Sequence, residues 1–148
     1  MTTIAWKNGQ LAADKRLDQW MTTCKIFKLP DGSHISGAGM FDDIIEIAAW
    51  FSAGCPPETR PQYAEDATDM LLMEPDGTCY WLTDPFLRKQ KVVEDYYAIG
   101  SGSKYALGAM AAGKSAKDAV LIAAKHDPDT GNGIDVVKSR KKRNISSK

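Results

Sequence analysis

Short apolar or alternating runs fill most of the chain, and they predict β-strands joined by tight turns. Asn8-Gly9 is the strongest hairpin signal, because a type I′ turn needs positive φ at both central residues. Pro30-Asp31-Gly32 and Pro75-Asp76-Gly77 mark two further turns. The strands expected on this pattern cover residues 2–7, 10–14, 24–29, 33–37, 69–74, 78–83, 96–100 and 134–137.

Three segments show a helical pattern instead. Apolar residues recur at helical spacing from Phe41 to Phe51, and Gly54 with the prolines after it ends that helix. A helix rich in alanine and glycine is expected over 101–112, and a third over about 115–125, with Ser115 as its N-cap. Residues 17–23 and 84–91 are left unassigned, and 55–66 is expected to be a loop with at most a helical turn.

The order of these elements predicts the fold class. Antiparallel hairpins with segregated helices are typical of α+β layers rather than a doubly wound parallel sheet. The chain has no G-x-G-x-x-G after a strand, and Gly113-Lys114-Ser115 lacks the upstream glycine of a phosphate-binding loop. Nucleotide-binding folds of these two kinds are therefore not expected.

Composition agrees with a single globular domain. The chain has 148 residues, 43% hydrophobic and 26% charged, and no apolar run of membrane-spanning length. The zero net charge hides an asymmetry, since six of the 19 basic residues lie in 138–148, which leaves 13 basic against 19 acidic residues elsewhere. We expect one acidic domain over 1–138 and a basic, disordered tail over 139–148, which makes the body a poor nucleic-acid binder.

Little in the chain favours a metal site, a disulfide framework or a histidine-based enzyme. The three cysteines are an odd number without a C-x-x-C pair, and the start of the chain does not read as a secretory signal. Both features favour a cytoplasmic protein. Neither His34 nor His126 lies beside a nucleophile motif such as G-x-S-x-G.

A different base is available at the start of the chain. Removal of Met1 would give Thr2 a free α-amine, which titrates near 7.7–8.0. A threonine hydroxyl with its own amine as base is one of the known nucleophile arrangements. By itself, a chain that begins Met-Thr-Thr is weak evidence for such a nucleophile, since an ordinary chain start followed by a strand has the same sequence.

Further motifs strengthen this interpretation. Taken together, they make the chain resemble the N-terminal threonine peptidases, a family of N-terminal nucleophile (Ntn) hydrolases that includes proteasome β-subunits and the bacterial peptidase HslV. The most specific match is the segment from Ala98 to Gly108, which is similar to the family's helix entry. The other matching segments, in chain order, are Thr2-Thr3-Ile4 with Asn8-Gly9, Leu11-Ala12-Ala13-Asp14, Cys24-Lys25-Ile26-Phe27-Lys28-Leu29, Gly37-Ala38-Gly39 with Asp42-Asp43, and Asp127-Pro128-Asp129-Thr130-Gly131.

The resemblance implies a catalytic site without metal or cofactor. Thr2 would attack the scissile carbonyl, and Asp14 would pair with Lys25, whose charge would lower the pKa of the Thr2 hydroxyl and amine. The Gly39 N–H would bind the oxyanion, with Gly37 as the alternative.

The resemblance also implies a group that holds the amine and a pocket for the substrate. Ser101, Asp127 and Thr130 would position the Thr2 amine, while Met40 and Phe41 would border a pocket for a substrate side chain. The same residues fit ordinary structural roles, since Ser101 could simply cap a helix and Asp127 could satisfy loop N–H groups.

The expected fold is an α/β/β/α sandwich of two mostly antiparallel sheets between helix layers, and the expected activity is endopeptidase action on polypeptides. The resemblance implies a closed homo-oligomeric ring and an ATP-dependent unfoldase partner. The chain departs from the family in its basic tail and in a brief segment after the first helix, which lacks most of one family helix. Two alternatives stay open, a catalytically inactive structural subunit and a nucleic-acid accessory protein that acts through the tail.

Overall fold

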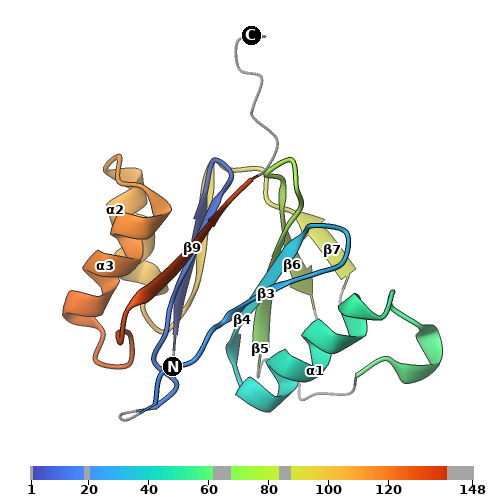
Figure 1. The fold of residues 1–148 in the computed structure, drawn as a ribbon. Helices are drawn as coiled ribbons and strands as arrows, with labels where there is room; N and C mark the ends of the chain where they lie inside the picture. The colour runs from blue at the N-terminus through green and yellow to red at the C-terminus, as the bar shows by residue number, and fades with distance from the viewer. Residues whose placement is uncertain (1, 19–20, 62–67, 84–87, 140–148) are drawn as a thin grey trace, which may run out of the picture.

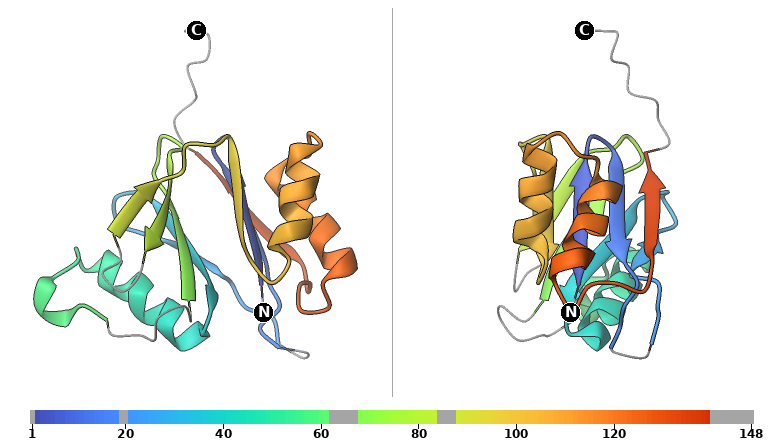
Figure 2. Two further views of the ribbon diagram at one scale, coloured as in Figure 1. Left: turned by 180° about the vertical axis from the view of Figure 1, so that it is seen from behind. Right: turned by 90° about the vertical axis from the view of Figure 1, so that its left-hand side faces the viewer.

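Two antiparallel sheets form the centre of the molecule, face to face (Figure 1). The structure is a computed structural model that describes residues 2–18, 21–61, 68–83 and 88–139. Helices cover the outer face of each sheet, so the described part of the chain has four layers, helix, sheet, sheet and helix (Figure 2). The α+β sandwich predicted from the sequence is confirmed.

The four-stranded sheet contains the start of the chain. Its order is β8-β1-β2-β9, and every neighbouring pair is antiparallel. In the turn between β1 and β2, φ is 45° at Asn8 and 82° at Gly9, so the positive φ predicted for both residues is confirmed. The four strands, in chain order, are β1 (Thr3–Lys7), β2 (Gln10–Asp14), β8 (Tyr96–Gly100) and β9 (Ile134–Lys138).

The five-stranded sheet follows the chain order without a crossover, β3-β4-β5-β6-β7, and is antiparallel throughout. The predicted turns at 30–32 and 75–77 join β3 to β4 and β5 to β6 as hairpins, whereas α1 (Phe41–Ser52) and η1 (Pro57–Thr59) lie in the chain between the paired strands β4 and β5. Its strands are β3 (Ile26–Lys28), β4 (His34–Gly39), β5 (Thr68–Met73), β6 (Cys79–Thr83) and β7 (Arg88–Lys91).

Three α-helices and one turn of 3₁₀-helix complete the described elements. Helix α1 (Phe41–Ser52) packs on the five-stranded sheet and is followed by η1 (Pro57–Thr59). Helices α2 (Ser103–Ala111) and α3 (Ala116–His126) pack on the four-stranded sheet. The Ser115 hydroxyl accepts the backbone N–H of Asp118 at 3.1 Å, so the predicted N-cap of the third helix is confirmed.

Large side chains fill the space between the sheets, whereas small ones line the interface with α2 and α3. Alternation along β1 places Ile4 and Trp6 in the inter-sheet core and Ala5 on the opposite face. Ala12 of β2 and Ala98 of β8 join Ala5 there, so α2 and α3 lie close to the strand backbones. In α2, the helix predicted to be rich in alanine and glycine, Ala106 packs in this interface, whereas a Cβ at Gly108 would have no neighbour within 4 Å.

Several boundaries differ from the prediction. The strand expected at 24–29 begins at Ile26, because Lys25 turns into the interior at one end of the sandwich. The strand expected at 33–37 extends to Gly39 in β4, which pairs with β5 through Gly39. The unassigned segment 84–91 contains β7, whose four exposed polar residues pair with β6 at the edge of the sheet.

The predicted tail lies almost wholly outside the described residues. Strand β9 ends at Lys138, and the backbone N–H of Ser139 donates to Gly9 O at 2.7 Å. Residues 140–148 are not described, so the division into a domain and a tail stays a prediction, as does any nucleic-acid role of the tail. The three cysteines are free thiols. Within the described ranges, none of the helices has the length and apolar character needed to cross a membrane.

The two faces of α1 give a direct test of this packing. Ile47 is fully buried against the sheet, whereas Ile45 on the same helix is 45% exposed. We expect Ile47→Ala to lower the free energy of unfolding by about 2–5 kcal/mol, because it leaves a cavity beneath the helix. Ile45→Ala should change it by less than about 0.5 kcal/mol. Urea denaturation of the two variants measures the difference, and equal losses would contradict this placement of α1.

Candidate active site

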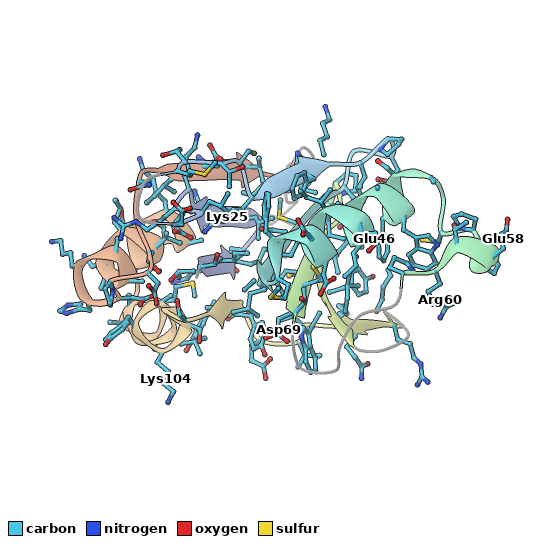
Figure 3. The ribbon with its side chains drawn as sticks, turned by 90° about the horizontal axis from the view of Figure 1, so that it is seen from below. Lys25, Glu46, Glu58, Arg60, Asp69 and Lys104 are labelled. Carbon is cyan, nitrogen blue, oxygen red and sulfur yellow. The ribbon has the colours of Figure 1, made fainter. Side chains whose placement is uncertain are left out.

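Thr2, Asp14 and Lys25 come together at one end of the sandwich. Thr2 directly precedes β1, Asp14 is the last residue of β2 and Lys25 directly precedes β3. Their exposed fractions are 6%, 0% and 3%. The β1–β2 register pairs Ile4 with Ala13 and so places Asp14 beside the start of β1. Lys25 lies between the two halves of the sandwich, near α1 (Figure 3).

The Lys25 ammonium connects the other two side chains. Its Nζ donates to Thr2 Oγ1 at 2.6 Å and to Asp14 Oδ1 at 3.0 Å. The hydroxyl of Ser36 in β4 donates to the backbone carbonyl of Lys25 at 2.6 Å and holds the lysine backbone in place. Because an ammonium has no acceptor, the proton of the Thr2 hydroxyl must point away from Lys25.

Asp14 accepts hydrogen bonds from four parts of the chain. Besides Lys25, its Oδ1 accepts the backbone N–H of Thr3 at 3.0 Å. Its Oδ2 accepts the backbone N–H groups of Arg16 at 3.2 Å and Gly131 at 3.0 Å. These four donors compensate for the burial of a carboxylate and connect β1, the end of β2 and the 127–131 loop.

Burial lowers the pKa of Lys25, because the interior disfavours the ammonium. The charge and hydrogen bond of Asp14 oppose this effect, while the positive charge of Arg16 adds to it. The net result is a lowered pKa, so this lysine holds its proton less tightly than an ordinary surface lysine.

A second group surrounds the backbone of Thr2. The Thr2 N–H donates to Ser101 Oγ at 3.2 Å, and the Ser101 hydroxyl is 2.6 Å from Asp127 Oδ2. Asp127 Oδ2 also accepts the Thr130 hydroxyl at 2.6 Å, and Thr130 Oγ1 lies 2.7 Å from Thr3 Oγ1. Ser101 therefore accepts from the Thr2 nitrogen while its own proton is directed to Asp127.

The pKa of Asp127 is lowered. Burial works in the opposite direction, but the hydrogen bonds from Ser101, Thr130 and the backbone N–H of Asp129 outweigh it. The carboxylate thus stays ionised and keeps the two hydroxyls oriented. Ser101 does not cap the helix that follows it. Gly102 occupies the N-cap position of α2, so the helix start has no side-chain cap.

Two glycines let the chain approach Thr2 and Thr3. Gly100 has φ +101°, and a Cβ built on it would lie 2.0 Å from the carbonyl oxygen of Thr2. A Cβ on Gly102 would lie 2.0 Å from Thr3 Oγ1. Any larger residue at either position would displace the start of β1, which explains the glycines around Ser101 in the sequence motif.

A pocket of about 350 Å³ opens beside Thr2 and Lys25. Gly39 lines it at the end of β4 with φ +132°, and Gly37 lines it as well, so both residues considered for the oxyanion role lie there. Met40 and Phe41 border the pocket at the start of α1, where the sequence placed them.

Other residues of this site were missed by sequence reasoning. Arg16, Leu17 and Ile44 line the same pocket. The Arg16 guanidinium binds the carbonyl of Pro128 and, at 3.3 Å, Asn132 Oδ1, so it fastens the 127–132 loop to the end of β2. Arg16 lies two residues after Asp14, and this spacing was the only sequence signal that could have found it.

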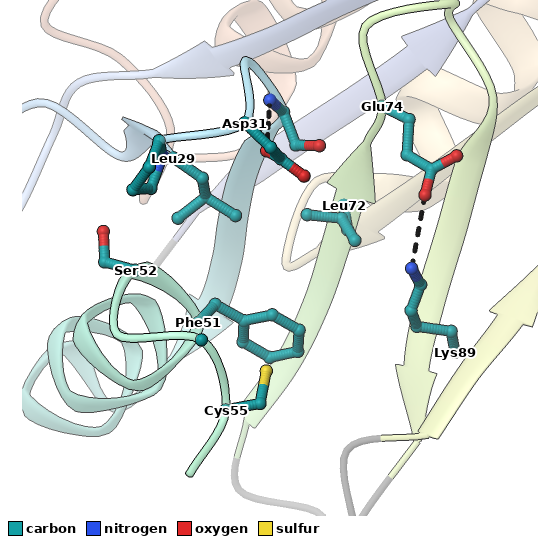
Figure 4. A pocket seen from close by; sticks show the side chains of 11 residues that line it. Leu29, Asp31, Phe51, Ser52, Cys55, Leu72, Glu74 and Lys89 are labelled. Carbon is teal, nitrogen blue, oxygen red and sulfur yellow. Dashed lines mark hydrogen bonds and ion pairs between the residues drawn. The ribbon is translucent and has the colours of Figure 1, made fainter.

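A second pocket, of about 370 Å³, lies at the other end of α1 (Figure 4). Phe51 and Cys55 line it from the helix end, and Leu29 and Leu72 line it from the sheet. Its Glu74 and Lys89 form an exposed ion pair at 3.2 Å. The pocket is separate from Thr2. Across the described ranges, no three His, Cys, Asp or Glu side chains gather in a way that could hold a metal ion.

Comparison with known proteins defines the class of fold and leaves the activity open. No protein-family model matches the chain, and no curated protein matches it. Solved structures do match over nearly the whole length, and they give the chain a proteasome-like fold.

Two of these neighbours are structures of Thiobacillus denitrificans BPH. The structure of BPH in complex with epoxomicin has a TM-score of 0.67 and 21% identity, over 93% of this chain and 98% of that chain. The other BPH structure has a TM-score of 0.61 and 22% identity, over 93% of this chain and 97% of that chain. At this identity the likeness shows the fold alone.

The buried ion pair can be compared with an exposed one in the same chain. Lys25→Met leaves the Asp14 carboxylate buried without its cation, and we expect it to lower the free energy of unfolding by about 3–5 kcal/mol. In the exposed ion pair, the side chains of Lys89 and Glu74 are 43% and 31% exposed. Lys89→Met removes the cation of this pair and should lower the free energy of unfolding by about 1 kcal/mol or less. Urea denaturation measures both, and a Lys25→Met loss no larger than that of the control would contradict this description.

The lowered pKa of Asp127 predicts a pH dependence of stability. A carboxyl whose pKa falls below its ordinary 3.8 on folding stabilises the protein above that value, and this contribution is lost as pH falls through the lowered value. Asp127→Asn cannot titrate. We therefore expect the stability difference between wild type and Asp127→Asn to be constant from about pH 7 to 5 and to shrink below about pH 4. Denaturation curves across this range test it, and a difference that grows toward low pH would contradict the sign.

Proposed function

We propose that the chain is a threonine-type endopeptidase whose nucleophile is Thr2 after removal of Met1. The observation that carries the proposal is the 2.6 Å contact between Lys25 Nζ and Thr2 Oγ1, made inside a buried network with Asp14. A cation in contact with a hydroxyl stabilises the alkoxide that forms during attack. Support also comes from the fold, which the chain shares with a protein that binds epoxomicin, a proteasome inhibitor.

In this mechanism one residue supplies both nucleophile and base. The Thr2 α-amine, neutral at cellular pH in part of the molecules, accepts the hydroxyl proton directly or through a water while Oγ1 attacks the scissile carbonyl carbon. The Lys25 charge lowers the pKa of both groups. Ser101 accepts one amine N–H, as it accepts the Thr2 N–H in the structure at 3.2 Å, and so leaves the nitrogen lone pair directed toward the hydroxyl.

The remaining steps follow from the same groups. The tetrahedral oxyanion accepts the backbone N–H of Gly39, or of Gly37, which lines the same pocket. The protonated amine returns its proton to the leaving amine, and the C–N bond breaks to leave an ester on Oγ1. Water then attacks this ester with the amine again as base, which releases the carboxylic acid product and regenerates Thr2.

The proposal extends to the setting of the enzyme. We place its substrate among polypeptides and its site inside a closed homo-oligomeric ring of the HslV type, since an enclosed site protects other proteins from cleavage. An ATP-dependent unfoldase is the corresponding partner. The free cysteines favour a reducing compartment such as the cytoplasm. Light scattering of the purified chain reports whether it assembles.

Replacement of Thr2 tests the chemistry. We expect Thr2→Ala to lower peptide hydrolysis by roughly 10⁴-fold or more and to abolish covalent labelling by epoxomicin, because the attacking oxygen is gone. Circular dichroism should show an unchanged fold. The exposed Thr59 provides a matched control, and Thr59→Ala should keep full activity.

Intact-mass measurement completes this experiment. A chain that retains Met1 and forms no epoxomicin adduct would overturn the peptidase proposal and favour the inactive structural subunit. An adduct mapped to a residue other than Thr2 would also overturn it.

A further inference from the structure

The loop of residues 127–132 carries groups that surround Thr2, and one side chain outside the loop, Arg16, binds it near both ends. We infer that Arg16 is a positioning residue of the peptidase, which holds Asp127 and Ser101 where they orient the Thr2 amine. This inference rests on the proposed function, because the orientation of that amine matters to catalysis only if Thr2 attacks peptides.

The guanidinium of Arg16 spans the loop. Its Nη1 donates to the backbone carbonyl of Pro128, while its Nε and Nη2 both donate to Asn132 Oδ1 at 3.3 Å. The Asn132 side chain is itself held, because its Nδ2 donates to the Met21 carbonyl at 3.1 Å. A Cβ on Gly131 would lie 3.0 Å from Arg16 Nη2, so the guanidinium lies directly against the loop backbone. A planar group with several fixed donors can hold two such acceptors at once.

Backbone contacts hold the middle of the same loop without the arginine side chain. The Gly131 N–H donates to Asp14 Oδ2 at 3.0 Å, and the Lys15 N–H donates to the Gly131 carbonyl at 3.0 Å. The Arg16 N–H also donates to Asp14 Oδ2, at 3.2 Å. None of these contacts uses the guanidinium, so a shorter side chain at position 16 can keep all of them. Loss of the guanidinium therefore frees the loop on either side of Gly131 and spares the surroundings of Asp14.

The loop is connected to the Thr2 nitrogen through Asp127. Pro128 directly follows Asp127 in the chain, so a shift of one moves the other. Asp127 Oδ2 lies 2.6 Å from the Ser101 hydroxyl oxygen, and Ser101 Oγ accepts the Thr2 N–H at 3.2 Å. A displacement of the Pro128 carbonyl therefore reaches the Thr2 nitrogen through two hydrogen bonds. Catalysis is sensitive to such displacements, since a misplacement of about 1 Å can cost about 10²-fold in rate.

A different role for Arg16, direct contact with the substrate, predicts different kinetics. Arg16 lines the pocket beside Thr2, so a substrate could touch it there. A lost substrate contact raises KM, whereas a misplaced amine lowers kcat. The positioning role is favoured because Nε, Nη1 and Nη2 of Arg16 each already bind the loop.

Lys15 provides a matched control for the loss of a cation next to Arg16 in the chain. Its ammonium pairs with Asp135 at 3.3 Å, and both side chains are about a third exposed. Lys15 does not line the pocket beside Thr2. Lys15→Gln therefore removes a positive charge at the end of β2 without removing a side chain that holds the loop.

Amide hydrogen exchange of the full chain gives the first measurement, read by mass spectrometry over residues 127–132. The Thr130 N–H donates to the Asp127 carbonyl at 3.1 Å and the Gly131 N–H donates to Asp14, so the loop has amides that its folded position protects. We expect Arg16→Gln to speed their exchange several-fold, because the loop opens more often. Lys15→Gln should leave the exchange unchanged. Equal exchange in wild type and Arg16→Gln would overturn the inference.

Peptide hydrolysis by the full chain after removal of Met1 gives the second measurement. Arg16→Gln should lower kcat by about ten- to hundredfold and change KM by less than about threefold, because the amine is misplaced while substrate still binds. The rate of epoxomicin labelling at Thr2 should fall in parallel, and Lys15→Gln should keep both rates. A raised KM with an unchanged kcat would assign Arg16 to substrate binding and overturn the positioning role.

Arg16→Lys separates the charge of this residue from its shape. Lysine keeps the positive charge, which adds to the effect of burial in lowering the pKa of Lys25. Its ammonium cannot form the planar fork that binds Pro128 and Asn132 together, so we expect kcat to stay about tenfold or more below the wild-type value. Urea denaturation checks that each variant is folded, and Arg16→Lys carries the test if Arg16→Gln is not. A kcat restored by lysine to the wild-type value would overturn the inference.

The two proposals fail in different ways. Cleavage that depends on Thr2, with the same kcat in wild type, Arg16→Gln and Lys15→Gln, would overturn the role of Arg16 and leave the peptidase intact. Absence of both cleavage and epoxomicin labelling at Thr2 in the wild-type chain would overturn the peptidase and the role of Arg16 in it together.

Discussion

A buried ammonium held between a carboxylate and a hydroxyl is the interaction on which the rest of this structure depends. Asp14 ends a strand of the four-stranded sheet, whereas Lys25 leads into the edge strand of the five-stranded sheet. Their 3.0 Å contact therefore joins the two sheets at one end of the sandwich. Removal of two charges from water is costly, so the pair is tolerable only because hydrogen bonds complete its surroundings.

Those hydrogen bonds explain why distant segments meet at Thr2. Backbone N–H groups at Thr3, Arg16 and Gly131 all point at Asp14. The 127–131 loop is thereby held against β1, and from there Asp127 reaches Ser101. Each contact limits the positions open to the next, so Thr2 is held from several directions. Such preorganisation lowers the rearrangement needed during a reaction.

Local sequence signals were sufficient for much of the fold. Asn8-Gly9 selects a turn with positive φ, the apolar spacing after Phe41 selects a helix, and Ser115 caps another, and each of these features acts within a few residues. Strand β7 could not be found in this way. Its four exposed polar residues are held as a strand by pairing with β6, which no pattern within 88–91 indicates.

The candidate site likewise contains residues that the sequence could predict and residues that it could not. The expectation that Asp14 and Lys25 lie near Thr2 came from a family resemblance. The spacing of these three residues in the sequence does not by itself predict that they meet. Arg16 was missed because its guanidinium binds a loop more than 110 residues away in the chain. Ser101 had two plausible roles in the sequence. Only the position of Asp127 in space directs its hydroxyl away from the helix end.

The two ends of the described chain lie at opposite ends of the sandwich (Figure 1). Ser139 binds Gly9 in the β1–β2 turn, roughly 20 Å along the strand from Thr2 at about 3.3 Å per residue. A group attached at Ser139 would therefore lie far from Thr2, while a group attached at the Thr2 nitrogen would adjoin the contacts that Thr2 makes with Ser101 and Lys25. An affinity tag, a fluorophore or a surface tether accordingly belongs at the carboxyl end of this protein.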